Sequence, residues 1–348
     1  MLALVLSAIL AAPLQEPVRE PAPEPVQESI TVRRVLVDVR VISHGGDVSD
    51  LTPDEFEVTI GGKKMEIESV ELVGSGYVPP PPVEVTDEEN AAAPEDEWIE
   101  PMGRTIVVFI QTDFTRNSAR LEGHMKFMQY TEDLLASLEP DDRVAVFSFD
   151  SHLKFRLDFS SDVEEIRAAM EGAIRIDAPS MPPAASGLSL ASQLDLRKLR
   201  AASRSEKALQ VIGEALRPIP GGKTMIFIGW GLGHKTATGT RMTWEWPAAV
   251  RALTEARVSL NVLDTTMADF HDLEIGLQAA AEQTGGFYAK THTHPMVAIS
   301  ELQAALSGYI ELSLRTSETL KPGMRPLEVR VKRRGVRVLA PESVLISR

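Results

Sequence analysis

The sequence contains no cysteine, and its longest apolar run is far too short to cross a bilayer more than once. The absence of cysteine excludes disulfides, cysteine-ligated zinc, iron–sulfur clusters and thiol nucleophiles. The chain still has 348 residues, of which 43% are hydrophobic. It can therefore form a sizeable core in two or three domains.

Positive charge is scarce in two segments of the chain. Residues 76–100 hold eight acidic residues and no lysine or arginine, and residues 13–29 hold four glutamates and one arginine. Both segments are rich in proline, a composition that cannot bury a core. The net charge of −14 is therefore a property of linkers, and it argues against electrostatic binding of nucleic acid.

Residues 1–12 are apolar and end in small side chains, as in the hydrophobic region and cleavage end of a secretory signal peptide. The basic residues that normally precede such a region are missing, so a misassigned start or an uncleaved anchor stays open. We expect an exported protein, periplasmic or extracellular, with a possible membrane tether through the N-terminus only. Residues 13–29 would form a Pro/Glu spacer.

Two segments carry the alternating pattern of half-buried strands, residues 30–75 and residues 309–348. In the first of these, Gly61-Gly62 stands where a two-residue hairpin turn is expected. The two segments carry opposite net charges, which favours pairing between them. We expect them to fold together as a small β-sandwich-like module. The acidic, proline-rich linker covers residues 76–101.

Residues 102–308 alternate between strand and helix patterns, which predicts an α/β fold: a doubly wound, mostly parallel sheet covered on both faces. Thr105–Ile110 is a continuous β-branched run, typical of a strand buried on both faces. A hairpin around residues 150–152 adds one antiparallel edge strand. Leu121, Met125, Met128 and Leu135 fall on one helical stripe, and we expect Met125, Phe127 and Met128 to face the core.

Four motifs occur in a familiar order along the chain. They are Leu51-Thr-Pro-Asp-Glu-Phe56, Arg104-Thr-Ile-Val-Val-Phe-Ile110, Leu138-Glu-Pro-Asp-Asp-Arg-Val-Ala-Val-Phe-Ser-Phe149 and Ala281-Glu-Gln-Thr-Gly-Gly-Phe287. Over roughly residues 30–345 the chain resembles the von Willebrand factor A (VWFA)-related domain proteins of the acidobacterial type. The resemblance implies an exported protein with a von Willebrand A, Rossmann-like fold. Such domains usually bind proteins and do not catalyse reactions.

Many members of that family carry a metal-ion-dependent adhesion site, in which short oxygen-bearing side chains hold a divalent cation. The corresponding loop here contains Asp113-x-Thr115-x-Asn117, but Gln111 occupies the place of the usual aspartate. Gly229 and its neighbours replace a second aspartate. We expect a degenerate site in which Asp113 and Thr115 hold Mg²⁺ or Mn²⁺, or no cofactor at all. The alternative is a vestigial loop in which Asp113 caps the following helix.

Loops gather at the carboxyl ends of the strands in an open α/β sheet, and ligands bind there. The residues that we expect to form a ligand-binding rim are Asp113, Thr115, Asn117, Ser189 and Trp230. Trp230 is a plausible anchor for a partner, and a packed loop aromatic is the alternative.

Three further motifs give only weak evidence for a phosphate, dinucleotide or metal site. Gly222-Lys223-Thr224 precedes a strand and lacks the upstream glycine of a phosphate-binding loop. The glycines at 229, 231 and 233 lack the spacing of a dinucleotide site. A metal site at His292, His294 and His271 has no nearby carboxylate after Glu282, and exposed loop histidines are the simpler interpretation.

The sequence therefore predicts a non-enzymatic protein-binding or adhesion module of the bacterial cell envelope. Its partner would be an unidentified envelope protein, and it would bind neither nucleic acid nor a dinucleotide. A scaffold or assembly subunit with no ligand at the rim is the first alternative. An uncharacterised enzyme is the second, and no complete catalytic constellation supports it.

Overall fold

The computed structural model describes residues 33–43, 48, 50–74, 103–113, 118–175, 180–316 and 320–347. The expected signal peptide (1–12), the spacer (13–29) and the acidic linker (76–101) lie outside the described residues. Within the described part, no helix is long and apolar enough to cross a membrane.

A six-stranded sheet forms the centre of the α/β region, in the order β12-β11-β8-β5-β6-β7. Its strands are β5 (Thr105–Gln111), β6 (Arg143–Phe149), β7 (Leu153–Ser160), β8 (Lys223–Gly229), β11 (Val258–Asp264) and β12 (Tyr288–Lys290). All neighbours are parallel except β6 and β7, which form the antiparallel hairpin. Every residue of β5, β8 and β11 is buried, because helices cover both faces. The predicted mostly parallel sheet with one antiparallel edge strand is confirmed.

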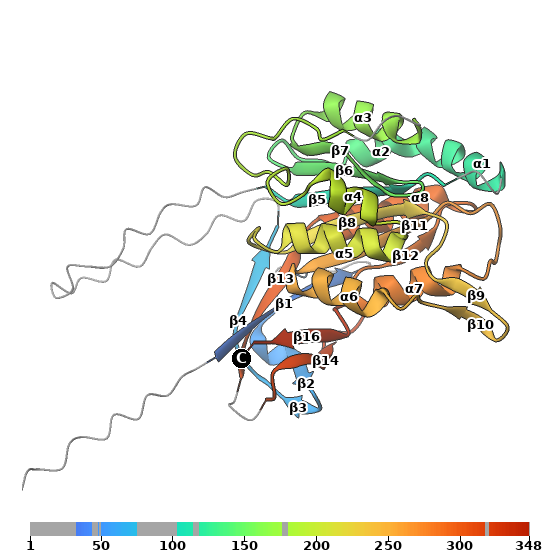
Figure 1. Cartoon of the computed structure of the whole chain (residues 1–348). Helices are drawn as coiled ribbons and strands as arrows, with labels where there is room; N and C mark the ends of the chain where they lie inside the picture. Colours follow the sequence, from blue (N-terminus) through green and yellow to red (C-terminus); the bar gives the residue numbers. More distant parts are fainter. Residues whose placement is uncertain are drawn as a thin grey trace, which may run out of the picture. The chain divides into compact units, whose positions relative to one another are not determined.

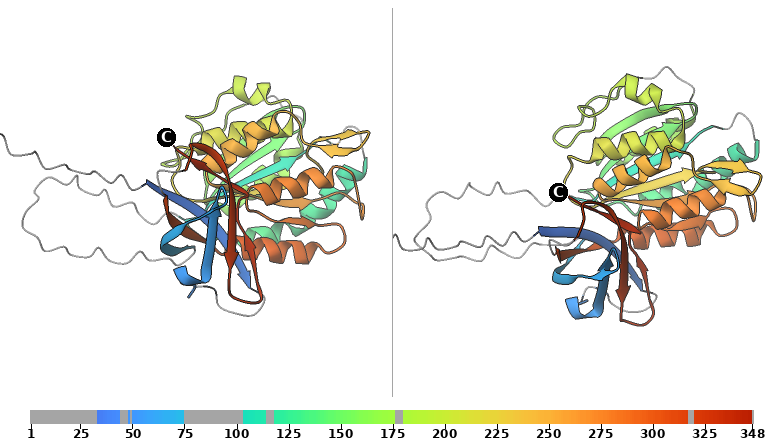
Figure 2. Two further views of the ribbon diagram at one scale, coloured as in Figure 1. Left: turned by 90° about the horizontal axis from the view of Figure 1, so that it is seen from below. Right: turned by 60° about the horizontal axis from the view of Figure 1, so that its bottom comes forward.

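Eight helices lie in the described part of this region, and Figures 1 and 2 show them on both faces of the sheet. They are α1 (Ser118–Phe127), α2 (Thr131–Leu135), α3 (Val163–Glu171), α4 (Leu196–Ala201), α5 (Ser205–Leu216), α6 (Trp246–Glu255), α7 (Glu274–Gln283) and α8 (Pro295–Leu306). Residues of α4 to α7 share one core cluster with the sheet, and residues of α1, α2, α3 and α8 share the other.

The expected apolar stripe of the first helix is wrong in part. Leu121 is 42% exposed and Met125 is 51% exposed, whereas Phe127 is buried. The α-helix ends at Phe127 and continues as a 3₁₀ turn over Met128–Tyr130. Gly123, His124 and Phe127 form the buried face of α1 instead, and Leu121 and Met125 lie off that face.

A second hairpin, β9 (His234–Thr236) and β10 (Gly239–Arg241), stands outside the large sheet between β8 and α6. It lies beside the start of α7 (Figure 1). Its strands have only three residues each, too few for an alternating pattern, and the sequence analysis did not predict it.

Two four-stranded sheets pack around a core of their own. One has the order β15-β1-β13-β4, from β15 (Val336–Leu339), β1 (Arg33–Ser43), β13 (Tyr309–Thr316) and β4 (Glu66–Val73). The other has the order β16-β14-β2-β3, from β16 (Ser343–Ile346), β14 (Gly323–Val331), β2 (Phe56–Ile60) and β3 (Lys63–Lys64). Strands from before and after the α/β region therefore pair with each other, as in β1 with β13.

The sandwich contacts the amino-terminal ends of β8 and β11. Arg257, in the turn before β11, forms ion pairs with Asp38 of β1 and Glu311 of β13. Buried Arg40 donates to Thr224 Oγ1 at 3.0 Å, and Tyr309 OH accepts from the backbone N–H of Gly222 at 2.8 Å. The carboxyl ends of the same strands lie at the opposite edge of the sheet and are not part of this junction.

Candidate functional site

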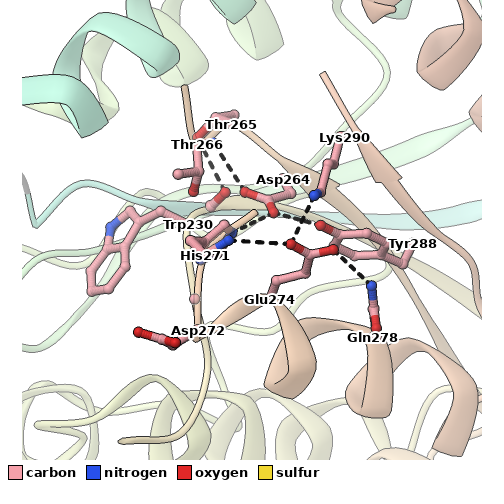
Figure 3. Close-up of polar contacts among 12 residues, drawn as sticks. Trp230, Asp264, Thr265, Thr266, His271, Asp272, Glu274, Gln278, Tyr288 and Lys290 are labelled. Carbon is pink, nitrogen blue, oxygen red and sulfur yellow. Dashed lines mark hydrogen bonds and ion pairs between the residues drawn. The ribbon is translucent and has the colours of Figure 1, made fainter. Parts of the chain in front are cut away.

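The candidate site lies at the carboxyl edge of the sheet, where β5, β8, β11 and β12 end. Strand register places Asp264 beside Gly229 on one side and Lys290 on the other. Gln111 ends β5 at the same edge. We call this edge, with the loops that follow its strands, the rim; Figure 3 shows its polar contacts.

Gln111 fills the place where the family resemblance implies an aspartate. Its side chain is buried, and all four of its hydrogen bonds go to neighbouring loops. The amide nitrogen donates to Ser205 Oγ and to the Gly231 carbonyl, both at 2.8 Å. The amide oxygen accepts from the backbone N–H groups of Trp230 at 2.8 Å and Gly231 at 3.1 Å. Gln111 thus fastens the loop after β8 to the start of α5.

Gly229 is required by this arrangement. A Cβ at Gly229 would lie 2.4 Å from Gln111 Oε1 and 2.6 Å from the Phe227 ring. A side chain at position 229 would therefore displace the Gln111 amide or the Phe227 ring from the position that it has here.

Asp264 is the most buried carboxylate of the rim, with 1% of its surface exposed. Its Oδ2 lies 2.7 Å from His271 Nε2 and accepts from Tyr288 OH at 2.6 Å. Its Oδ1 accepts from the backbone N–H of Thr266 at 2.9 Å. Both oxygens are thus engaged by groups from three different segments.

Glu274 forms the second half of the same network. It is 7% exposed and opens α7. Its carboxylate pairs with Lys290 Nζ at 2.8 Å and accepts from Gln278 Nε2 at 3.0 Å. A longer bond of 3.4 Å from the backbone N–H of His271 joins the two halves. Figure 3 shows these side chains converging from β11, β12 and α7.

The network sets the protonation states of its members. Burial by itself would raise the pKa of Asp264, but the hydrogen bonds from His271, Tyr288 and Thr266 outweigh it and hold that pKa below its usual range. Burial and the neighbouring Asp264 charge raise the pKa of the Tyr288 hydroxyl. Tyr288 is therefore a permanent donor to an ionised Asp264, and it is a poor nucleophile.

Trp230 follows β8 and points away from the Asp264 network (Figure 3). Its indole ring is half-buried, and the Arg120 guanidinium stands 3.2 Å from the ring centroid. Its Nε1–H is buried and makes no hydrogen bond in the described structure. An indole N–H can only donate, so a buried one without an acceptor is costly and can be satisfied by a ligand.

The remaining predicted rim residues have different outcomes. Asp113 follows β5 and is half-buried, while Thr115 and Asn117 lie outside the described residues. Ser189 is held elsewhere. Its hydroxyl donates to Asp158 of β7 at 2.5 Å, and β7 runs antiparallel, so residue 158 lies toward the amino-terminal edge of the sheet. The structure therefore does not bring Ser189 to Trp230.

The described residues of the rim do not fit a divalent cation. Gln111 directs amide hydrogens where a metal would need a lone pair, and Asp264 already accepts three hydrogen bonds. No group of three histidine, aspartate or glutamate side chains suited to a metal occurs among the described residues. Asp113 with Thr115 as a metal site stays a prediction, because Thr115 is not described.

The sequence analysis missed Asp264 and Glu274 as site residues, and it considered His271 only as a metal ligand. A signal was present for Asp264, which directly follows the buried run Leu260–Leu263. A carboxylate at the end of a buried parallel strand is expected at the ligand edge. His271, Glu274 and Lys290 carry no such signal, because only the loop fold brings them to Asp264.

No family model matches the chain, and no curated protein matches it. Several solved structures are similar at low identity. A von Willebrand factor type A protein from Catenulispora acidiphila is 10% identical, with 70% of this chain and 66% of that chain covered and a TM-score of 0.41. The vWF domain of the type V pili tip protein Mfa5 from Porphyromonas gingivalis is 10% identical, with 58% and 94% covered and a TM-score of 0.37.

The protein BatB from Bacteroides thetaiotaomicron is 14% identical, with 58% of this chain and 98% of that chain covered and a TM-score of 0.38. These likenesses are distant. The function proposed below therefore rests on the residues of the rim.

Proposed function

We propose that the protein recognises another protein of the cell envelope at the rim, without metal and without catalysis. The observation that carries this proposal is the Gln111 amide, which joins the loop after β8 to α5 through four hydrogen bonds. A rim held by side-chain amide bonds is organised before a partner arrives. Preorganisation lowers the entropy cost of binding.

The electrostatics of the rim favour binding over catalysis. His271 and Asp264 form a pair of the kind that activates a nucleophile, but the only hydroxyl of a described residue that bonds to the Asp264 carboxylate is that of Tyr288, whose pKa is raised. General-base activation needs a nucleophile within hydrogen-bond reach. Lys290 and the Trp230 indole instead offer a charge and an aromatic surface of the kind found at binding hot spots.

The sandwich supports the same proposal through its position. Its contacts with Arg257, Thr224 and Gly222 involve the amino-terminal ends of β8 and β11. A tether through the N-terminus would join the described structure at β1, in the sandwich and not at the rim. Export and this tether remain part of the proposal.

Affinity capture from the native envelope fraction tests the proposal with the full chain as bait. Trp230→Ala removes the aromatic surface, and Lys290→Glu reverses the charge of the partly exposed lysine of the network. Lys321→Glu makes the same charge change on the sandwich and serves as the matched control. We expect a partner retained by the wild type and the control to be lost from both rim variants, after circular dichroism has shown that both are folded.

Retention of the same partner by both rim variants would contradict rim recognition. In that case the partner binds another face, and the scaffold or assembly role becomes the better interpretation. Adding EDTA to the capture is a further check: the proposed recognition does not depend on a metal, so chelation should leave the partner bound.

A further inference from the structure

A second surface lies outside the Asp264 network, around the β9–β10 hairpin. Three large apolar side chains near this hairpin are strongly exposed: Trp244 at 80%, Phe270 at 65% and Ile275 at 47%. Single exposed apolar residues are ordinary, but a group of large ones marks an interaction site. We call these three residues, with the hairpin, the crest.

The hairpin packs on the start of α7 along a seam that lies close in sequence to all three exposed side chains. Thr240 Oγ1 donates to the Asp272 carbonyl at 2.6 Å, and Lys235 pairs with the Asp272 carboxylate. On the other side of the seam, a Cβ at Gly276 would lie 3.3 Å from Met242 Sδ. Trp244, Phe270 and Ile275 lie within two residues of Met242, Asp272 and Gly276, respectively.

The hairpin also carries a positive charge. Arg241 is exposed and forms no ion pair with a described residue, whereas the neighbouring Lys235 is paired with Asp272. His234 faces Arg241 across the two strands and is also exposed. The crest therefore fits a segment that combines acidic and large apolar residues.

The chain itself contains such a segment directly before β5. Residues 95–102 read Glu-Asp-Glu-Trp-Ile-Glu-Pro-Met, with four acidic residues around Trp98 and Ile99. We propose that the crest of one copy binds this segment of a second copy. Trp98 would pack against Trp244 and Phe270, and the acidic residues would face Arg241.

The segment cannot reach the crest of its own copy. Trp98 is five residues before Gly103, so it lies within about 18 Å of it even when fully extended. Gly103 lies at the amino-terminal end of β5, and the seven residues of that strand alone span about 23 Å toward the rim. The contact therefore joins one end of a copy to the other end of the next. A contact of this head-to-tail type continues beyond a dimer.

Sedimentation velocity on the full chain over a range of concentrations tests the proposal. We expect the wild type to associate as its concentration rises, and added salt to weaken the association because opposite charges contribute to it. Trp98→Ala and Trp244→Ala should each weaken association by about tenfold or more, since a buried tryptophan is a typical hot spot. Met296→Ala removes another exposed apolar side chain and should leave association unchanged.

Mixing the two tryptophan variants gives the decisive result. The Trp98→Ala chain keeps its crest and the Trp244→Ala chain keeps its segment, so an equal mixture should form dimers and nothing larger. A wild type that stays monomeric, variants that associate like the wild type, or a mixture that fails to dimerise would each overturn the proposal. The test is independent of recognition at the rim, because Trp230 and Lys290 are unchanged in every variant.

Discussion

Gln111 shows how one amide can replace a charged site. A glutamine has both donors and acceptors, so it can satisfy the Gly231 carbonyl and the Trp230 N–H group at once. A carboxylate has acceptors only, and it would need a cation to hold the same loops. The neutral amide therefore gives the rim a fixed shape that does not depend on metal concentration.

The change Gln111→Glu tests this role. The glutamate would place a buried negative charge against the Gly231 carbonyl, which would lose its donor, although the Ser205 hydroxyl can turn to donate to the carboxylate. We expect the free energy of unfolding at neutral pH to fall by about 3 kcal/mol, as for a buried charge left without a partner. Urea unfolding measures it. Gln193→Glu makes the same change at an exposed position, and equal stability of the two variants would contradict the role given to Gln111.

His124 of α1 predicts how stability depends on pH. The side chain is 1% exposed, and burial lowers its pKa from 6.5 to about 4. At a pH between these two pKa values, His124 binds a proton in the unfolded chain but not in the folded chain. The free energy of unfolding therefore falls as pH falls from about 6.5 to about 4. The total loss for a shift of this size is about 3 kcal/mol.

Urea unfolding between pH 4 and pH 7 measures this loss. A His124→Gln chain has no titrating group at this position, so its stability should change less over the same range. His234→Gln removes an exposed imidazole and should keep the wild-type dependence. If His124→Gln followed the wild-type curve, another group would have to cause the acid sensitivity.

At the scale of elements, the turn between α6 and β11 has an arginine in the left-handed conformation that glycine usually adopts. Arg257 has a φ of 55° and is the only residue other than glycine with a positive φ among those described. Glycine is the usual residue at this position after a helix, because it adopts the left-handed conformation at no steric cost. Arginine is less favourable here, but its guanidinium bridges Asp38 and Glu311 on two strands of the sandwich.

The change Arg257→Gly separates these two effects. Glycine would relieve about 1 kcal/mol of backbone strain, but two partly buried carboxylates would lose their shared cation. We expect a net loss of about 2 kcal/mol in unfolding free energy. Adding Asp38→Asn and Glu311→Gln to the same chain should recover part of this loss, because no unpaired charge remains. A single variant as stable as the wild type would show that the bridge contributes nothing.

The elements differ in how well the sequence predicts them, for physical reasons. Long β-branched strands such as β5 are visible because burial on both faces leaves a continuous apolar run. Asp162, the N-cap of α3, accepts from the backbone N–H groups of Glu164 and Glu165, which is the local pattern expected of a capping aspartate. In α8, Met296 and Val297 are exposed while Ala298 and Ile299 are buried. Its apolar residues therefore follow no clear stripe, and the sequence analysis did not predict this helix.

At the scale of the molecule, the sheet could be predicted and much of the site could not. Strand order and direction follow from alternating units along the chain, a local signal. The Asp264 network depends on loops that bring residues 264, 271, 274 and 290 together from three elements. Ser189 was predicted to lie at the rim, but its hydroxyl bonds to Asp158 instead. The composition of a loop does not reveal such a partner. Membership of the von Willebrand A family stays a prediction.

The α/β region lies in the chain between two paired strands of the sandwich, β4 and β13. A Cβ at Gly74, where β4 ends, would lie 2.8 Å from the Ser307 carbonyl, and Tyr309 of β13 pairs with Val73. Arg104 donates to the Leu306 carbonyl at 2.7 Å, so the first and last residues of the α/β region also meet. A tight turn from Gly74 to Gly308 would close the sandwich as a hairpin. The sandwich is thus a host for a guest domain, and evolution could exchange that guest without redesigning the host.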